Sequence, residues 1–191
     1  MKNVYVLSVL FCFISILSSY SQKISAEYFR VDSNILIKFI GKPEKYFYQT
    51  PLGDITIFEY KPEINANDSN CLYSIALYRP PLDEVKDNKL SNLQLEVKFN
   101  SIISSEDIAN GNLGGKVLSK NEIILNGIRR IRMKILFSGL TELNEIEGQK
   151  DIIYNAEYLR YNDIVIKLWT YTPLNKENMK IYSFFNSLRF D

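Results

Sequence analysis

Histidine is absent from this chain of 191 residues. Its absence removes the commonest general base, the commonest metal ligand and the usual pH switch of proteins. Cysteine is scarce as well, since the chain has two, Cys12 and Cys71. Cys12 lies in an N-terminal segment that we expect to be removed, so no disulfide can form within the remaining chain. We therefore expect no metal site and no cofactor, and we assign no catalytic residue.

The chain also lacks an excess of charge of either sign. It carries 23 basic and 22 acidic residues, and loss of residues 1–21 would remove only the charge of Lys2, leaving 22 of each. A neutral protein has no general electrostatic attraction for the phosphates of nucleic acids or for anionic membranes. We therefore expect a protein or a small molecule as the partner, and no nucleic acid.

The N-terminus has the pattern of a signal peptide. Lys2 precedes the apolar run Val4–Leu17, and the small residues Ser19 and Ser21 follow it. The run is shorter than the ~20 residues that span a bilayer, although a retained anchor is the alternative interpretation. Cleavage after Ser21 would leave residues 22–191 as a single globular α+β domain. This mature chain would have no transmembrane segment and would be periplasmic or extracellular.

The segment Asp151–Thr172 predicts a β-hairpin at the centre of the fold. Its two β-rich runs flank Asn162 and Asp163, a pair suited to a two-residue loop. In that register Ala156 faces Trp169, and both faces of the hairpin are largely apolar. Apolar residues on both faces are typical of central strands that are covered on both sides.

Other segments have the composition or alternation of strands. They are residues 35–40, 45–49, 55–60, 71–78, 116–119, 122–125 and 128–137. Leu90–Ala109 alternates like a strand in its first half, but its apolar residues also fit helical spacing, and we interpret it as a helix. A second helix with a core-facing stripe is predicted by Ile181, Phe184, Phe185 and Leu188. Cys71 lies on an apolar strand face, which favours a buried thiol over a nucleophile.

Short motifs follow one another along the chain in a recognisable order. They are Phe39-Ile40-Gly41-Lys42-Pro43, with Ile40 where proline would stand, a turn at Thr50–Gly53, Leu113-Gly114-Gly115, Asn126-Gly127, and Phe184 or Phe185 leading to Ser187. This order resembles the exported bacterial branch of the PsbP-like fold family, which also includes extrinsic photosystem proteins and relatives of a Ran-binding import factor. The resemblance implies an α+β fold, mainly an antiparallel β-sheet with helices packed on both faces as an α/β/α sandwich. It implies no catalytic residues, because the family has no shared active site, and a shared fold does not assign a function.

One face of the predicted hairpin carries aromatic residues with cations at their edge. The members of this aromatic cluster are Tyr154, Tyr158, Trp169 and Tyr171, with Arg160 and Lys167. Aromatic rings beside cations can form a groove for a sugar, a peptide or a small molecule. The alternative, which we favour, is core beneath a helix, because aromatic stripes on central strands usually pack. The C-terminal helix or the helix at 90–109 would then cover Trp169.

A basic stripe lies on one face of strand 128–137 and consists of Arg130, Arg132 and Lys134. Three cations at alternate positions can hold an anionic ligand. They can equally pair across the sheet with three residues that share one face of the next strand, Asp151, Asn155 and Glu157. We favour this pairing, which is a common way to complete an exposed sheet face.

The sequence thus favours a non-catalytic exported domain that binds a protein or a small ligand. Glu142, Glu145 and Glu147 raise a second hypothesis, a carboxylate-based hydrolase. They lack the spacing of a calcium loop, and a solvated acidic loop explains them as well. The third hypothesis is a scaffold or accessory subunit of an envelope complex.

Expression from the chain's own start codon in its native host tests the signal peptide. We expect the recovered protein to begin at Gln22, because signal peptidase cuts after small residues such as Ser21. Intact-mass measurement reads the cleavage site directly. A mass that retains Met1, or that includes a lipid on Cys12, would contradict the prediction.

Overall fold

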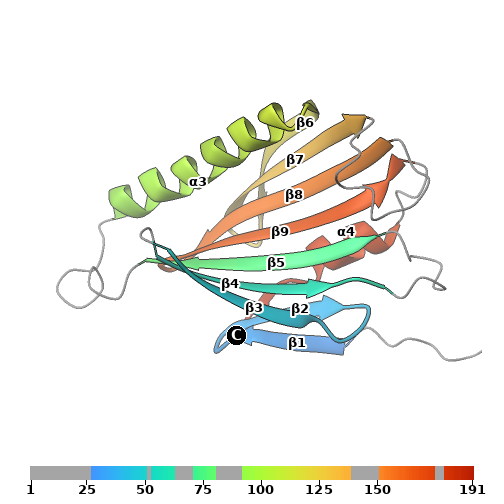
Figure 1. Cartoon of the computed structure of the whole chain (residues 1–191). Helices are drawn as coiled ribbons and strands as arrows, with labels where there is room; N and C mark the ends of the chain where they lie inside the picture. The colour runs from blue at the N-terminus through green and yellow to red at the C-terminus, as the bar shows by residue number, and fades with distance from the viewer. Residues whose placement is uncertain (1–26, 51–52, 63–70, 81–91, 139–150, 175–178) are drawn as a thin grey trace, which may run out of the picture.

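The computed structural model describes residues 27–50, 53–62, 71–80, 92–138, 151–174 and 179–191. Most of this chain forms a seven-stranded antiparallel sheet, and a small three-stranded sheet lies beside it (Figure 1). In spatial order the large sheet consists of β3 (Glu44–Thr50), β4 (Gly53–Tyr60), β5 (Leu72–Arg79), β9 (Ile164–Pro173), β8 (Asp151–Tyr161), β7 (Ile128–Ser138) and β6 (Gly115–Leu125). The small sheet consists of β1 (Glu27–Asp32), β2 (Ile35–Phe39) and β10 (Arg189–Phe190). The expected α+β fold with a mainly antiparallel sheet is confirmed.

The hairpin of β8 and β9 has the register that the sequence predicts. Tyr161 pairs with Ile164 across the two-residue loop, and Ala156 pairs with Trp169. Asn162 adopts a positive φ of 54°, a conformation that asparagine tolerates better than most residues and that tight hairpin loops require. With β5 beside β9 and β7 beside β8, the hairpin lies well inside the large sheet.

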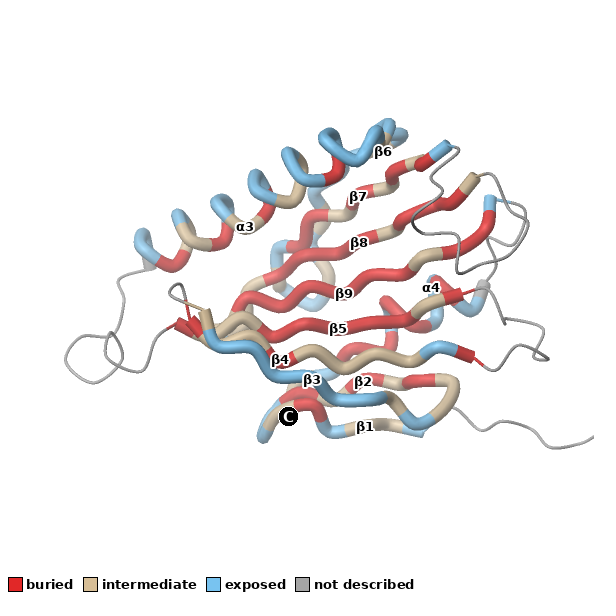
Figure 2. Tube along the Cα trace, viewed as in Figure 1, coloured by how far each residue is buried: buried red, intermediate tan, exposed pale blue. Residues whose placement is uncertain are grey.

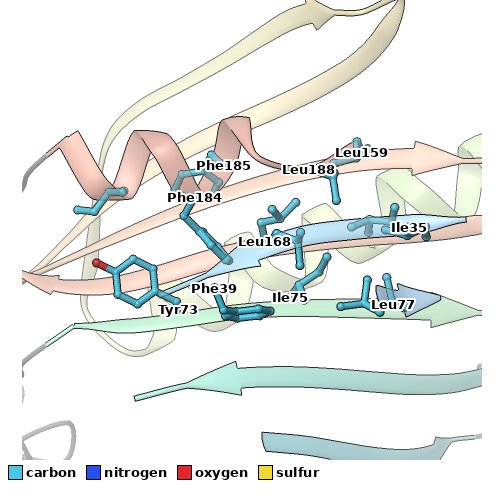
Figure 3. Close-up of a cluster of buried hydrophobic side chains, with 14 of the residues drawn as sticks. Ile35, Phe39, Tyr73, Ile75, Leu77, Leu159, Leu168, Phe184, Phe185 and Leu188 are labelled. Carbon is cyan, nitrogen blue, oxygen red and sulfur yellow. The ribbon is translucent and has the colours of Figure 1, made fainter. Parts of the chain in front are cut away.

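Strand alternation sends the side chains of the large sheet into two separate hydrophobic clusters. The first cluster contains Ile75 and Leu77 of β5 and Leu168 of β9, and residues of β2 and of helix α4 (Met179–Asn186) pack onto it (Figure 3). The α4 residues are those of the predicted stripe, and the structure buries Ile181, Phe184, Phe185 and the following Leu188. Cys71 belongs to this cluster and is 2% exposed, so the predicted burial of its thiol is confirmed.

The second cluster lies on the other side of the same strands and includes Trp169. Helix α3 (Asn92–Asn112) contributes Phe99 and Ile103 to it, alongside Ala156 and Tyr158 of β8. Of the two helices considered as the cover of Trp169, α3 is therefore the one in contact with its cluster. Figure 2 shows the resulting pattern, in which the central strands are buried along most of their length while the outer side of α3 is exposed.

The element boundaries differ from the sequence expectation in three places. β1 and β10 were not predicted, because β1 alternates poorly and β10 has only two residues. The two short strands expected at 116–119 and 122–125 are one strand, β6, whose register shifts between Val117 and Ser119. The expected helix at 90–109 continues to Asn112 as α3 and ends before Gly114, which adopts a positive φ of 76° that favours glycine.

Within the described residues, no helix is both long enough and apolar enough to cross a membrane.

The substitution Trp169→Ala tests how firmly α3 and the sheet depend on their shared cluster. Trp169 is 8% exposed, so removing its side chain should lower the free energy of unfolding by about 3–5 kcal/mol. Denaturant unfolding measures this loss, with Tyr182→Ala as the control because Tyr182 is 55% exposed. Trp169 is the single tryptophan, so its fluorescence should be blue-shifted and poorly quenched by acrylamide. A readily quenched Trp169 and a stability loss no larger than that of the control would contradict the assignment to the core.

Candidate functional site: a basic pocket beside helix α4

The register of β6, β7 and β8 brings polar side chains together on the face of the sheet that carries α4. Ser119, Lys134 and Asn155 form one row across these strands. Asn121, Arg132 and Glu157 form the next row. Further along the second row, β9 and β5 contribute Leu168 and Ile75, which belong to the cluster under α4. The polar side chains therefore begin where the apolar core of this face ends.

A pocket of about 150 Å³ lies at this boundary between core and polar rows. Its lining comes from β6 (Ser119, Asn121), β7 (Arg132, Met133, Lys134), β8 (Asn155, Ala156, Glu157) and α4 (Ile181, Tyr182, Phe185). Two members of the predicted basic stripe thus line a pocket whose other wall is a helix. Arg130, the third member, lies behind them and is 1% exposed.

Glu157 holds the two arginines of the stripe together. One of its oxygens, Oε1, accepts a hydrogen bond from Nη1 of Arg130 at 2.5 Å, and Oε2 accepts one from Nε of Arg132 at 2.5 Å. The carboxylate is completely buried, whereas the side chain of Arg132 keeps 35% of its surface exposed. Burial raises the cost of leaving any of these charges unpaired, so the three side chains depend on one another.

The predicted ion pairing is confirmed for Glu157, but the expectation of an exposed sheet face was wrong. Arg130 and Glu157 are buried, because β8 is an interior strand and the rows continue into the core under α4. In the strand register Asp151 lies opposite Ser138, four residues beyond Lys134 on β7. Asn155 lies opposite Lys134, as expected from the sequence.

The pocket presents hydrogen-bond donors and an excess of positive charge. Arg130 and Arg132 carry two positive charges against the single carboxylate of Glu157, and Lys134 lies in the neighbouring row. The side-chain nitrogen Nδ2 of Asn155 is buried and has no hydrogen-bond partner among the described residues. An amide N–H without an acceptor at the wall of a pocket is suited to an oxygen atom of a ligand. The arrangement can therefore bind an anion, whereas Glu157, paired with two guanidinium groups, is not placed to act as a base.

The residues of the predicted aromatic cluster lie on the opposite face, beneath α3. Tyr154 is 1% exposed and Tyr158 is completely buried, and Trp169 packs in the same hydrophobic cluster. The rings of Tyr154 and Tyr171 lie 5.0 Å apart, with Tyr171 at the half-buried margin. The interpretation of this face as core beneath a helix agrees with this burial. As a ligand site, the cluster stays a prediction.

Lys167 lies inside the aromatic cluster and forms an ion pair with α3. Its ammonium group is 2.5 Å from Oε1 of Glu106 and 4.7 Å from the centre of the Trp169 ring. Burial lowers the pKa of Lys167, and the nearby carboxylate of Glu106 opposes that shift. Burial also raises the pKa of Tyr158, and it raises that of Tyr171 to about 12, so both phenols stay neutral at physiological pH.

Arg160, the other cation of the cluster, also reaches α3. Its Nη1 lies 3.8 Å from Oε2 of Glu96, and Arg129 of β7 contacts the same carboxylate. These pairs, together with Lys167 and Glu106, connect the sheet to both halves of α3. In this structure the cations of the aromatic cluster therefore fix a helix in place.

Several pocket residues were missed by sequence reasoning. Ser119 and Asn121 lie on a strand that was read as two pieces, so their face could not be assigned. Tyr182 directly follows Ile181 of the apolar stripe of α4. This position places it at the margin of the buried side of the helix, which is the signal that could have identified it. Glu142, Glu145 and Glu147 fall outside the described residues, and within the described part of the chain His, Cys, Asp and Glu form no group of three that could hold a metal.

Comparison with solved structures supports the fold. Cyanobacterial PsbP (CyanoP) from Synechocystis matches 90% of this chain and 95% of its own length with a TM-score of 0.55, at 12% sequence identity. The Ran-binding protein Mog1p of Saccharomyces cerevisiae matches 86% of this chain and 96% of its own, with a TM-score of 0.44 and 11% identity. No protein family model matches the sequence, and no curated protein matches it. The match to cyanobacterial PsbP confirms the resemblance to the PsbP-like fold, and at such low identity it concerns the fold alone.

The substitution Glu157→Ala tests whether the buried carboxylate holds the pocket together. Its loss leaves Arg130 charged and buried without its partner, so we expect the free energy of unfolding to fall by about 3–5 kcal/mol. Glu122→Ala is the matched control, because Glu122 pairs with Arg129 on the surface, where a pair contributes about 0–1 kcal/mol. Urea unfolding of both variants measures the difference. Similar losses in the two variants would contradict the role given to Glu157.

Proposed function

We propose that this protein is an exported, non-catalytic binding or accessory domain, and that its pocket beside α4 binds a small anionic ligand with oxygen acceptors. The observation that carries the proposal is the combination of Arg132, Lys134 and the unpartnered amide of Asn155 on the wall of one pocket. A carboxylate or phosphate group would accept hydrogen bonds from these donors and balance the excess positive charge. Tyr182, at the pocket margin, would pack against the rest of the ligand.

Export is supported by the N-terminal sequence, in which Lys2, the run Val4–Leu17 and Ser21 match a signal peptide. An α/β/α arrangement of the mature chain is supported by the separate memberships of the two helices, since α3 packs in the cluster of Trp169 and α4 in the cluster of Leu168. In this arrangement the sheet holds Arg132 and Asn155 on a rigid support, as precise ligand binding requires.

Binding is favoured over catalysis by the chemistry of the pocket. Glu157 is the one carboxylate among its lining residues, and both of its oxygens accept hydrogen bonds from arginine. The alternative, a carboxylate-based hydrolase, would depend on Glu142 and Glu145. Turnover of glycans or peptides that is lost in Glu142→Gln or Glu145→Gln would favour that alternative, and capture of the protein in an envelope complex would favour a scaffold subunit.

Titration calorimetry with acetate, succinate, inorganic phosphate and sulfate tests the pocket. We expect at least one of these anions to bind, and Arg132→Gln to weaken its binding on the order of tenfold to a hundredfold, because a charge-assisted hydrogen bond is lost. Arg129→Gln is the matched control: it removes the same charge from the same strand, three residues before Arg132, but Arg129 contacts Glu96 and Glu122 on the opposite face.

Asn155→Leu provides a second variant, which removes the amide donor without changing the charge. It should weaken binding, whereas the Arg129→Gln control should bind the anion as tightly as the unsubstituted protein. Absence of binding for all four anions up to about 10 mM, or equal weakening in Arg132→Gln and Arg129→Gln, would show that the pocket is not an anion site.

A further inference from the structure

The strand β3 forms one edge of the large sheet and is exposed along almost its whole length. Three consecutive aromatic residues lie in its middle: Tyr46 is 37% exposed, Phe47 is 55% exposed and Tyr48 is 51% exposed. Figure 2 shows β3 as a continuous exposed band at the edge of the large sheet, below β4 in this view. An exposed aromatic edge strand with free backbone groups is a template for pairing with another strand.

The opposite edge of the sheet, β6, is less regular than β3. Its register shifts between Val117 and Ser119, and charged residues occur along it at Lys116, Lys120 and Glu122. Bulges and charges are the devices by which proteins protect a sheet edge. In contrast, β3 pairs with β4 in an unbroken register from Glu44 to Thr50. The register of β3 is thus regular from end to end, whereas that of β6 is broken in its first half.

The register of the β3–β4 hairpin indicates which backbone groups of β3 point outward. Thr50 pairs with Gly53, so two residues separate the strands. The pair that flanks a two-residue hairpin loop exchanges both of its hydrogen bonds, and such pairs alternate along an antiparallel ladder. By this alternation Lys45, Phe47 and Gln49 direct their N–H and C=O groups away from β4, toward an incoming strand.

We propose that β3 is a self-association surface, on which β3 of a second copy of this chain adds as an antiparallel strand about a two-fold axis through Phe47. In this register Phe47 faces Phe47 of the second copy, Lys45 faces Gln49, and Tyr46 faces Tyr48. Glu44 then faces Thr50, so all seven residues of the strand pair. Aromatic side chains meet aromatic side chains, and no charged residue faces a charge of the same sign.

The neighbouring registers fit less well, which is the reason for assigning this one. A shift of the two-fold axis to Tyr46 would place Pro43, which has no N–H group, opposite Gln49. A further shift to Lys45 would place the two lysines opposite each other. A shift in the other direction, to Tyr48, would place Lys45 opposite Pro51. The sequence of β3 is complementary to itself in the register centred on Phe47.

Sedimentation velocity of the purified protein over a range of concentrations tests the dimer, with two opposite substitutions of Gln49. Within the chain Gln49 faces Asp54 of β4, whereas in the dimer it faces Lys45 of the second copy. Gln49→Lys should therefore favour the hairpin but weaken the dimer, and Gln49→Glu should do the reverse. Because each substitution acts twice in a two-fold dimer, we expect dimer dissociation constants that differ on the order of tenfold between the variants. Near-ultraviolet circular dichroism checks that both variants are folded.

Single cysteines test the register independently. Phe47→Cys should form a covalent dimer on mild oxidation, because residues in a hydrogen-bonded antiparallel pair have Cα atoms about 5.5 Å apart, within disulfide reach. Lys45→Cys is the matched control: its counterpart in the second copy lies four residues away along the ladder, about 13 Å, and it should not cross-link. Cys71 is buried and is present in both variants.

Three results would overturn the proposal. The first is a protein that remains monomeric at about 100 µM, a concentration at which even weak specific dimers associate. The second is a dimer with the same dissociation constant in Gln49→Lys and Gln49→Glu. The third is cross-linking of Lys45→Cys that is as fast as that of Phe47→Cys.

Discussion

Strands β8 and β9 are covered on both faces, and this double coverage constrains every polar side chain that they carry. A charge that is buried within such a strand has no access to bulk water, so it needs an opposite charge from a neighbouring element. Glu157 obtains its partners from Arg130 and Arg132 on β7, and Lys167 obtains its partner from Glu106 on α3. The two buried charges of the hairpin point to opposite faces and are neutralised in different ways.

The pairing of Lys167 and the pairing of Glu157 have different consequences for the molecule. Lys167 is paired by a single carboxylate on a helix, which fixes α3 over the aromatic cluster and leaves no excess charge. Glu157 is paired by two arginines, so its side of the sheet keeps a surplus of positive charge. The surplus lies where α4 stops covering the sheet, and a pocket at that boundary is open to ligands. Pairing of the buried charges thus fixes a helix on one face, and on the other it leaves the pocket to which we assign ligand binding.

The sequence was most informative where the pattern was local. The register of β8 and β9 followed from a two-residue loop at Asn162 and Asp163, and the α4 stripe followed from helical spacing. The basic stripe was recognised, but its burial was not, because burial of Arg130 depends on which helix lies over β7 and β8. The spacing of apolar residues along the sequence does not determine whether α3 or α4 covers Trp169. Ser119 and Asn121 were missed because a bulge in β6 changes which side chains share a face.

The unequal treatment of the two sheet edges bears on the size of any assembly that this chain can build. A sheet can extend through many subunits only if each subunit has two edge strands that can pair with strands of other subunits. Here β6 is interrupted by a bulge and carries charges, while β3 is regular. If β3 pairs with β3 of a second copy about a two-fold axis, that contact uses the same edge on both subunits, so it closes on itself and adds no third subunit.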